Sequence, residues 1–144
     1  MSKLTLLLLL TLSATAPSTA CTATTRDGEA THWGEAKEMQ PMKIRLRVEK
    51  KTLTATLIDS ETTRDFVSLL PLTITMNDLL GREKYGHLPR AISGRGERRR
   101  SYDVGDVIYW SPGPDVAIYY RHDGEAIPPP GVIVIGSLTP EHMR

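Results

Sequence analysis

The sequence predicts a small, mainly β domain, a β-barrel with one short helix. Several short segments alternate apolar with polar residues, the period of a strand with one face in a core and one in water. Turn-forming residues separate these segments, and one segment has the spacing of a helix. The chain of 144 residues is long enough for one domain with a sizeable core, so we expect a single barrel.

The predicted barrel domain, residues 42–140, begins with a β-hairpin. Residues 43–49 alternate aliphatic with charged side chains. Residues 52–57 repeat the alternation with threonine at the polar positions, and β-branched threonine suits a pleated surface. Residues 49–51 form the predicted turn.

One short helix is predicted over residues 62–70. Phe66, Leu69 and Leu70 are spaced to lie on one helical face. Thr62 stands three residues before an aspartate, a capping-box arrangement that marks the start of a helix. A proline follows Leu70 and ends the helix. We expect Phe66 to plug the barrel.

Five further strands are predicted after the helix. They span residues 72–77, 83–85, 104–110, 116–121 and 131–138. Glycine and proline interrupt any period between residues 79 and 103, so this part is expected to be largely irregular. Residues 132–135 are apolar in succession, so the last strand is expected to be central and covered on both faces.

Residues 1–20 have the order of a cleavable signal peptide. A lysine at position 3 precedes a short, mostly apolar run, residues 4–12, and small residues follow as far as Ala20. The run is about half of the roughly 20 residues that a membrane-spanning helix needs. We therefore expect an exported protein, either periplasmic, attached to the cell envelope as a lipoprotein, or secreted.

Two kinds of cleavage fit the residues before Cys21. Small side chains at Ser18 and Ala20 suit a general signal peptidase, which would release a soluble protein. The same residues resemble a bacterial lipobox, in which the cysteine is lipidated, although an aliphatic residue usually stands in the place of Ser18. Cys21 is the only cysteine and cannot form a disulfide within the chain. It is the candidate lipidation site, and a lipid there would be the chain's link to a membrane; otherwise it is a free thiol.

Residues 21–41 are predicted to be a flexible tether, because they are rich in Thr, Ala, Gly and Glu and poor in aliphatic residues. The formal net charge of the chain is +1, so no polyanionic partner is implied. Arginines gather at residues 95–100, but no aromatic residues interleave with them. We expect a solvated loop there and no nucleic-acid site.

No metal or cofactor is predicted. The four histidines are scattered, without the spacing of a metal site: His32, His87, His122 and His142. The sequence also holds no glycine-rich phosphate loop and no redox cysteine pair.

Four blocks of sequence carry a family resemblance. They include Asp65-Phe66 with Leu69-Leu70-Pro71-Leu72, Glu83-Lys84-Tyr85 with Leu88-Pro89, Gly105-Asp106-Val107-Ile108-Tyr109-Trp110, and Ile135-Gly136. In order and spacing these blocks are similar to the bacterial cyclophilin-like domain family, over residues 42–138. The chain departs from the family at residues 49–51, where the family usually turns through Gly or Asn, and in the longer basic loop at residues 95–100.

The resemblance implies a closed, eight-stranded barrel of the cyclophilin type. It does not imply prolyl isomerase activity, because cyclophilins use an arginine on a barrel strand. The comparable strand here, residues 72–77, holds no arginine, so the electrostatic element of that chemistry is missing. We therefore expect a non-enzymatic domain that binds a peptide segment or a small ligand. A peptidyl-prolyl isomerase with a degenerate site is the alternative.

The candidate ligand-binding residues lie at one face of the barrel. They are Met76, Glu83, Tyr85, Tyr109, Trp110 and Tyr119. An outward Trp110 beside Tyr85 would form an aromatic floor for a ligand. The alternative is that these rings fill the barrel and cover its rim. Glu83 could act with Asp78 and Asp106 in acid–base chemistry, but such residues more often cap turns, and no catalytic residue is predicted.

Overall fold

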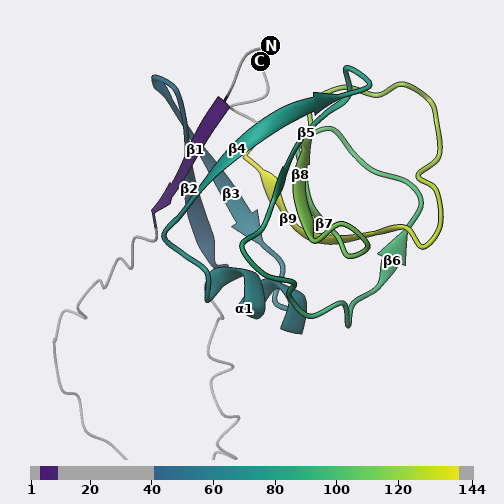
Figure 1. Ribbon diagram of the computed structural model, residues 1–144, viewed down its shortest axis with the longest axis horizontal. Helices are drawn as coiled ribbons and strands as arrows, with labels where there is room; N and C mark the ends of the chain where they lie inside the picture. The colour runs from purple at the N-terminus through teal and green to yellow at the C-terminus, as the bar shows by residue number, and fades with distance from the viewer. Residues whose placement is uncertain (1–3, 10–40, 140–144) are drawn as a thin grey trace, which may run out of the picture.

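The computed structural model describes residues 4–9 and 41–139. They form one strongly curled sheet of nine strands with one short helix beside it (Figure 1). The mainly β class and the short helix predicted from the sequence are confirmed. No helix in this part of the chain is long and apolar enough to cross a membrane.

The strands are all paired antiparallel. In chain order the elements are β1 Leu4–Leu9, β2 Lys43–Val48, β3 Lys51–Leu57, α1 Glu61–Val67, β4 Leu72–Leu79, β5 Glu83–His87, β6 Arg98–Arg99, β7 Asp106–Trp110, β8 Asp115–Tyr119 and β9 Val132–Leu138. Across the sheet the order is β3-β2-β1-β4-β5-β8-β7-β9-β6, and β3 pairs in addition with β9.

β2 and β3 form the hairpin predicted at the start of the domain. Ile44 and Leu46 are each 1% exposed, and the charged residues that alternate with them, Lys43, Arg45 and Arg47, are on the exposed face. The turn passes through Glu49 with a φ of 52°. This is a left-handed conformation, which Gly and Asn adopt more readily than Glu.

α1 begins and ends earlier than predicted. Its N-cap is Ser60, whose side-chain oxygen accepts a hydrogen bond from the backbone N–H of Thr63 at 3.1 Å. Thr62, the predicted cap, lies inside the helix and is fully buried. The helix ends at its C-cap, Ser68. Phe66 is 1% exposed and packs in the main core, as predicted.

The strands after the helix form near the predicted positions, with two differences. β4 and β5 both run past their predicted ends, to Leu79 and His87. β6 is a two-residue strand in the part expected to be irregular, and it pairs with β9. β9 also pairs with β7 and β3, and most of its residues are buried, as expected of a strand covered on both faces.

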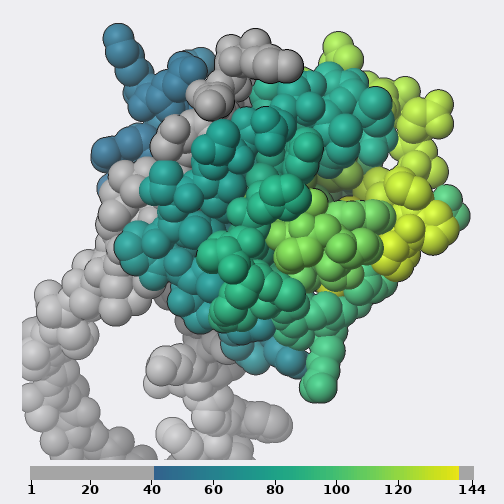
Figure 2. Space-filling view, in the orientation of Figure 1, coloured from purple at the N-terminus to yellow at the C-terminus, as the bar shows by residue number. Residues whose placement is uncertain are grey.

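An apolar core lies on each face of the sheet. The main core lies within the curl and includes Tyr109 of β7. A smaller core on the opposite face combines Ile108 of β7 with Tyr102 and Ile127, which come from loops. Successive side chains of a strand point to opposite faces, so Ile108 and Tyr109 belong to different cores. Tyr85 of β5 packs against this smaller core. In Figure 2 the light green to yellow part of the chain lies beside the teal part.

β1 places part of the predicted leader in the sheet. It lies between β2 and β4, and its Leu6 has Val48 as Cα partner on one side and Ile74 on the other (Figure 1). The cleavage site, Cys21 and nearly all of the predicted tether fall in residues 10–40, outside the described residues. The leader, its cleavage and the lipid anchor therefore remain predictions.

The resemblance implies a closed barrel, whereas the structure shows a curled sheet. At one seam β3 meets β9 through three residue pairs, from Ala55–Leu138 to Leu57–Gly136. At the other, β2 and β4 are joined through β1. The expected closed barrel is therefore corrected to a curled sheet that does not form a closed barrel.

Candidate functional site

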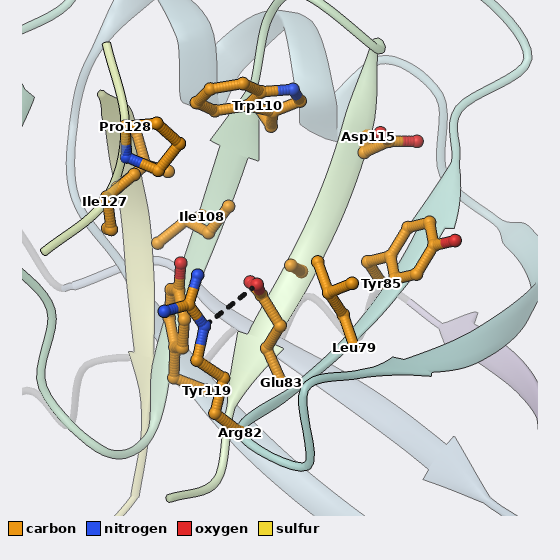
Figure 3. A pocket seen from close by; sticks show the side chains of 12 residues that line it. Leu79, Arg82, Glu83, Tyr85, Ile108, Trp110, Asp115, Tyr119, Ile127 and Pro128 are labelled. Carbon is orange, nitrogen blue, oxygen red and sulfur yellow. Dashed lines mark hydrogen bonds and ion pairs between the residues drawn. The ribbon is translucent and has the colours of Figure 1, made fainter. Parts of the chain in front are cut away.

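A pocket of about 310 Å³ lies on the face of the sheet opposite the main core (Figure 3). Its apolar lining consists of Leu79, Ile108, Ala117, Ile127, Pro128 and Val132. Three aromatic residues, Tyr85, Trp110 and Tyr119, and three charged residues, Arg82, Glu83 and Asp115, complete it. The volume is at the lower end of the range for ligand pockets, about 300–1,000 Å³.

Alternation along β7 and β8 positions the pocket residues. Ile108 and Trp110 line the pocket, whereas Tyr109 between them packs in the main core. On β8, Ala117 has Tyr85 of β5 and Ile108 of β7 as its Cα partners. A small side chain at this central position leaves space that a larger aliphatic residue would fill.

The loop at residues 120–131 covers one side of the pocket and supplies Ile127 and Pro128. Ile127 is 1% exposed. Its backbone N–H donates to the carbonyl of Arg100 at 2.9 Å, and its carbonyl accepts from Nε of Arg100 at 2.8 Å. This wall of the pocket is thus fixed by hydrogen bonds as well as by burial.

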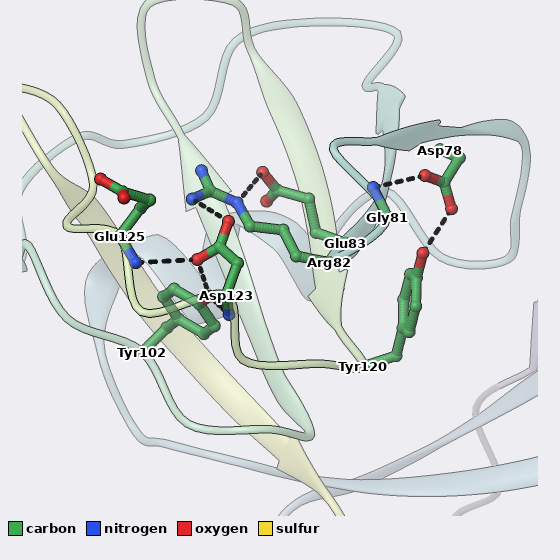
Figure 4. Close-up of polar contacts among 8 residues, drawn as sticks. All are labelled: Asp78, Gly81, Arg82, Glu83, Tyr102, Tyr120, Asp123 and Glu125. Atoms are coloured by element: carbon green, nitrogen blue, oxygen red, sulfur yellow. Dashed lines mark hydrogen bonds and ion pairs between the residues drawn. The ribbon is translucent and has the colours of Figure 1, made fainter.

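The polar end of the pocket is built around Arg82, which is 6% exposed (Figure 4). Its Nη1 donates to Oδ2 of Asp123 at 3.1 Å, and its Nε donates to Oε1 of Glu83 at 3.4 Å. The guanidinium carbon lies 5.6 Å from the ring centroid of Tyr102 and 5.9 Å from that of Tyr119, within cation–π range. Arg82 is therefore held by two carboxylates and two rings.

Tyr102 and Asp123 connect this cluster to the loops. The rings of Tyr102 and Tyr119 stack with 3.8 Å between centroids. The Tyr102 hydroxyl donates to Oδ1 of Asp123 at 2.8 Å, and the backbone N–H of Glu125 donates to the same oxygen at 3.0 Å. The N–H of Glu125, then the Tyr102 hydroxyl and Arg82, hold the pKa of Asp123 below its ordinary value. Asp123 therefore stays ionised beside the arginine.

Burial raises the pKa of both Glu83 and Tyr119. Glu83 is 5% exposed, and burial raises the pKa of its carboxyl although Tyr119 and Arg82 act in the opposite direction. Burial and the charge of Glu83 raise the pKa of the Tyr119 hydroxyl, which therefore stays protonated and can donate to Glu83. Burial opposes the charge on Arg82, but Glu83 and Asp123 outweigh it, and the pKa of Arg82 is raised.

Asp115 lies near Trp110, at the other end of the pocket (Figure 3). Its Oδ1 contacts Nδ1 of His87, whose side chain is 73% exposed. Burial raises the pKa of the Asp115 carboxyl, and the neighbouring His87 acts against this. Asp115 thus has a partner at the protein surface, whereas Glu83 has all its partners inside the molecule.

Four of the six candidate ligand-binding residues line this pocket: Glu83, Tyr85, Trp110 and Tyr119. Met76 and Tyr109 do not. Each is 1% exposed and packs in the main core, on the other face of the sheet. The hydroxyl of Tyr109 accepts a hydrogen bond from the N–H of Ile92 at 3.3 Å. For Tyr109 the structure agrees with the alternative that the rings fill the interior, and Met76 is buried there as well.

Asp78 and Asp106, the other two carboxylates considered, lie away from the pocket lining. Asp78 accepts a hydrogen bond from Nζ of Lys84 at 2.7 Å. It also accepts one from the Tyr120 hydroxyl at 2.6 Å (Figure 4). Oδ2 of Asp106 accepts from the backbone N–H of Asp103 at 2.9 Å. Both therefore stabilise turns and strand ends. Across residues 4–9 and 41–139, no three His, Cys, Asp or Glu side chains are grouped so that they could hold a metal ion.

Sequence reasoning missed Arg82, Ile108 and the loop residues Ile127 and Pro128. Arg82 follows two turn residues with φ angles of 54° and 62°, where no strand period applies. Ile108 carries a usable signal, because it is two positions from Trp110 and must share its face. Ile127 and Pro128 carry no such signal in the sequence, because their approach to the sheet depends on long-range contacts.

Comparison with known proteins assigns a family to this fold. A family model described as the cyclophilin-like family matches residues 46–144. The chain belongs to the cyclophilin-like family. The solution structure of the hypothetical protein AF2241 from Archaeoglobus fulgidus is similar, with 27% identity and a TM-score of 0.56 over 69% of this chain and 80% of that chain. No curated protein matches the sequence.

The family match confirms the resemblance seen in the sequence blocks. It begins at Leu46 and includes every pocket residue, while β1 lies outside it. Membership of the cyclophilin-like family indicates the architecture, whereas an activity depends on the residues of the site.

Proposed function

We propose that this cyclophilin-like domain binds a peptide segment or a small, mostly apolar ligand in the pocket over β5, β7 and β8, without converting it chemically. The observation that supports this is the composition of the pocket. It combines an apolar lining, the rings of Tyr85 and Trp110, and the buried carboxylate of Glu83. Apolar walls of this kind provide affinity, and a few polar groups orient the ligand.

Tryptophan fluorescence tests the proposal. The chain has two tryptophans, so Trp33→Phe in the full chain leaves Trp110 as the reporter. We expect members of a panel of short peptides and small aromatic compounds to change its emission. Their affinity, measured by calorimetry, should fall about tenfold or more in Trp110→Ala, because aromatic anchors in pockets carry much of the binding energy.

Tyr120→Ala is the matched control. Tyr120 is an aromatic residue next to β8, 43% exposed, and it does not line the pocket. Its removal should leave the affinities unchanged. Equal binding by wild type and Trp110→Ala would count against this pocket as the site.

Prolyl isomerase activity is the second candidate, and Arg82 is the observation that favours it. The pocket contains a buried arginine, although β4 has none. Its Nη1 and Nε already face carboxylates at 3.1 and 3.4 Å, so fewer donors are free to stabilise a twisting amide. A protease-coupled assay with a proline peptide distinguishes the two candidates: a rate that matches the uncatalysed background excludes isomerase activity, and a rate lost in Arg82→Lys supports it.

We also propose that residues 1–20 direct export. The order of a basic residue, an apolar run and small residues supports this. Mass spectrometry of the N-terminus of protein purified from cells is the test. A chain that begins at Cys21 with acyl groups supports a lipid anchor, and one without them supports a free mature protein. A chain that retains residues 1–20 contradicts cleavage.

A further inference from the structure

We propose that the pocket selects ligands in which a protonated amine is attached to an apolar body. The inference rests on the proposed ligand binding and adds the chemical class of the ligand. It follows from three features of the site: the balance of charge, the position of Glu83, and the rings around the apolar floor.

The charged groups around the pocket are mainly negative. Arg82, Glu83 and Asp115 line it, and Asp123 binds Arg82 from the covering loop. Among the lining residues, one guanidinium against two carboxylates gives a net charge of −1 when all are ionised. Arg82 is already neutralised by Glu83 and Asp123. A ligand that enters this site therefore meets an excess of negative charge at short range.

Glu83 is the carboxylate best placed to receive a cation. It is 5% exposed, and Figure 3 shows its oxygens pointing inward between Arg82 and Leu79. The contact between Arg82 Nε and Glu83 Oε1 is 3.4 Å, longer than the roughly 2.7–2.9 Å of a strong charge-assisted bond. A carboxylate accepts about four hydrogen bonds, so Glu83 has acceptor capacity left for an ammonium group.

Aromatic rings and aliphatic side chains suit the rest of such a ligand. Trp110 and Tyr85 stand at the sides, and Ile108 lies between Trp110 and Glu83 (Figure 3). Ala117, the Cα partner of Ile108, also lines the pocket. An apolar body can be buried against Ile108 and Ala117. The faces of the rings favour the positive charge and its neighbouring methylene groups.

An anionic ligand does not suit this pocket. Its charge would be buried beside Glu83, and the single positive charge of Arg82 is already shared between Glu83 and Asp123. A third carboxylate at this end of the pocket would therefore add a buried negative charge without a matching cation, which is unfavourable. The same argument predicts that a neutral ligand of equal shape binds with intermediate affinity.

Three probes of matched shape test the inference: 3-phenylpropylamine, 3-phenylpropanol and 3-phenylpropionate. Binding to the full-length Trp33→Phe chain is followed by Trp110 fluorescence at neutral pH. We expect the amine to bind about tenfold or more tighter than the alcohol, and the carboxylate to bind weakest. A blocked Ala-Lys-Ala peptide and its norleucine counterpart show whether a lysine side chain can supply the same amine.

Glu83→Gln should abolish the preference for the amine over the alcohol while leaving the alcohol bound. Glu125→Gln, an exposed carboxylate that does not line the pocket, is the control and should keep the preference. If Glu83→Gln does not fold, the test is the ratio of the affinities for the amine and the alcohol, measured on the Trp33→Phe chain.

The outcomes separate the two levels of the proposal. Equal affinity for amine and alcohol, or tighter binding of the carboxylate, overturns the inference about the amine while ligand binding in the pocket stands. If neither the three probes nor the two peptides bind, both the inference and the proposed function at this pocket fail.

Discussion

Arg82, in the turn between β4 and β5, donates from Nη1 to Oδ2 of Asp123 at 3.1 Å, and this contact joins the sheet to the loop that covers the pocket (Figure 4). The two side chains are 7% and 19% exposed. The same guanidinium also contacts Glu83 at 3.4 Å. One side chain therefore fixes the polar end of the pocket and holds the loop in place.

Replacing Arg82 with methionine should destabilise the protein strongly. The change keeps the apolar stem of the side chain and leaves the buried Glu83 without its countercharge. Breaking one side of a buried ion pair typically costs about 3–5 kcal/mol, and we expect the lower part of this range because Asp123 remains partly exposed. Urea unfolding followed by circular dichroism measures the loss.

Arg64→Met is the matched control for this prediction. Arg64 pairs with Asp59 at 2.8 Å, with side chains 66% and 48% exposed. Exposed pairs contribute about 0–1 kcal/mol, so this variant should unfold close to wild type. Equal losses for both arginines would contradict a central role for Arg82 in stability.

The pKa of Asp78 should be about 2. A hydrogen bond from Lys84 lowers it most, followed by one from the Tyr120 hydroxyl. The unfolded value is about 3.9, so the stabilisation is fully present above that pH and is lost as the pH falls towards 2. An NMR titration of the Asp78 carboxyl carbon should show the low pKa in wild type and a clear rise in Lys84→Met. Lys50→Met, an exposed lysine of the first hairpin, should leave the titration unchanged.

Gly86→Ala should weaken the contact between β4 and β5. A Cβ at this position would lie 2.9 Å from the carbonyl oxygen of Thr75, a backbone atom that cannot turn aside. Overpacking of this kind costs about 1–3 kcal/mol, measurable as a lower urea midpoint. Gly94→Ala is the control, because its nearest neighbours are 3.4 and 3.8 Å away. An equal fall in the urea midpoint of both variants would contradict the clash with Thr75 as the cause.

The alternation of apolar and polar residues was sufficient to find the strands but not to orient them. β7 and β8 are buried almost throughout. A pattern with a period of two therefore cannot tell which of Ile108, Tyr109 and Trp110 faces the pocket. Only the packing of residues 120–131 against one face shows which of them meet a pocket. The helix start was misplaced for a related reason, since Ser60 and Thr62 are both plausible caps and tertiary burial of Thr62 decides between them.

The site was partly predictable because its aromatic residues lie on strands. Trp110 and Tyr119 carry a strand pattern, and Glu83 begins a strand. Arg82 and Ile127 lie in a turn and a loop, where local sequence sets no period. Their positions come from contacts far apart in sequence, such as the hydrogen bonds between Arg100 and Ile127.

The pairing of β1 with β4 gives the last prediction, that cysteines replacing Thr5 and Thr75 will form a disulfide in the full-length chain. The two residues are Cα partners, and partners across an antiparallel pair have Cβ atoms about 4.5–5.5 Å apart, close enough for a disulfide after small adjustments. Cys21→Ser removes the native thiol, and mild oxidation followed by non-reducing electrophoresis and mass spectrometry measures the yield of the disulfide.

Thr5→Cys with Thr56→Cys is the control, because β2 lies between β1 and β3. Cross-linking of the first pair alone would show that residues 4–9 form a strand between β2 and β4 in the uncleaved chain. Equal yields for both pairs, or none for the first, would contradict the placement of β1.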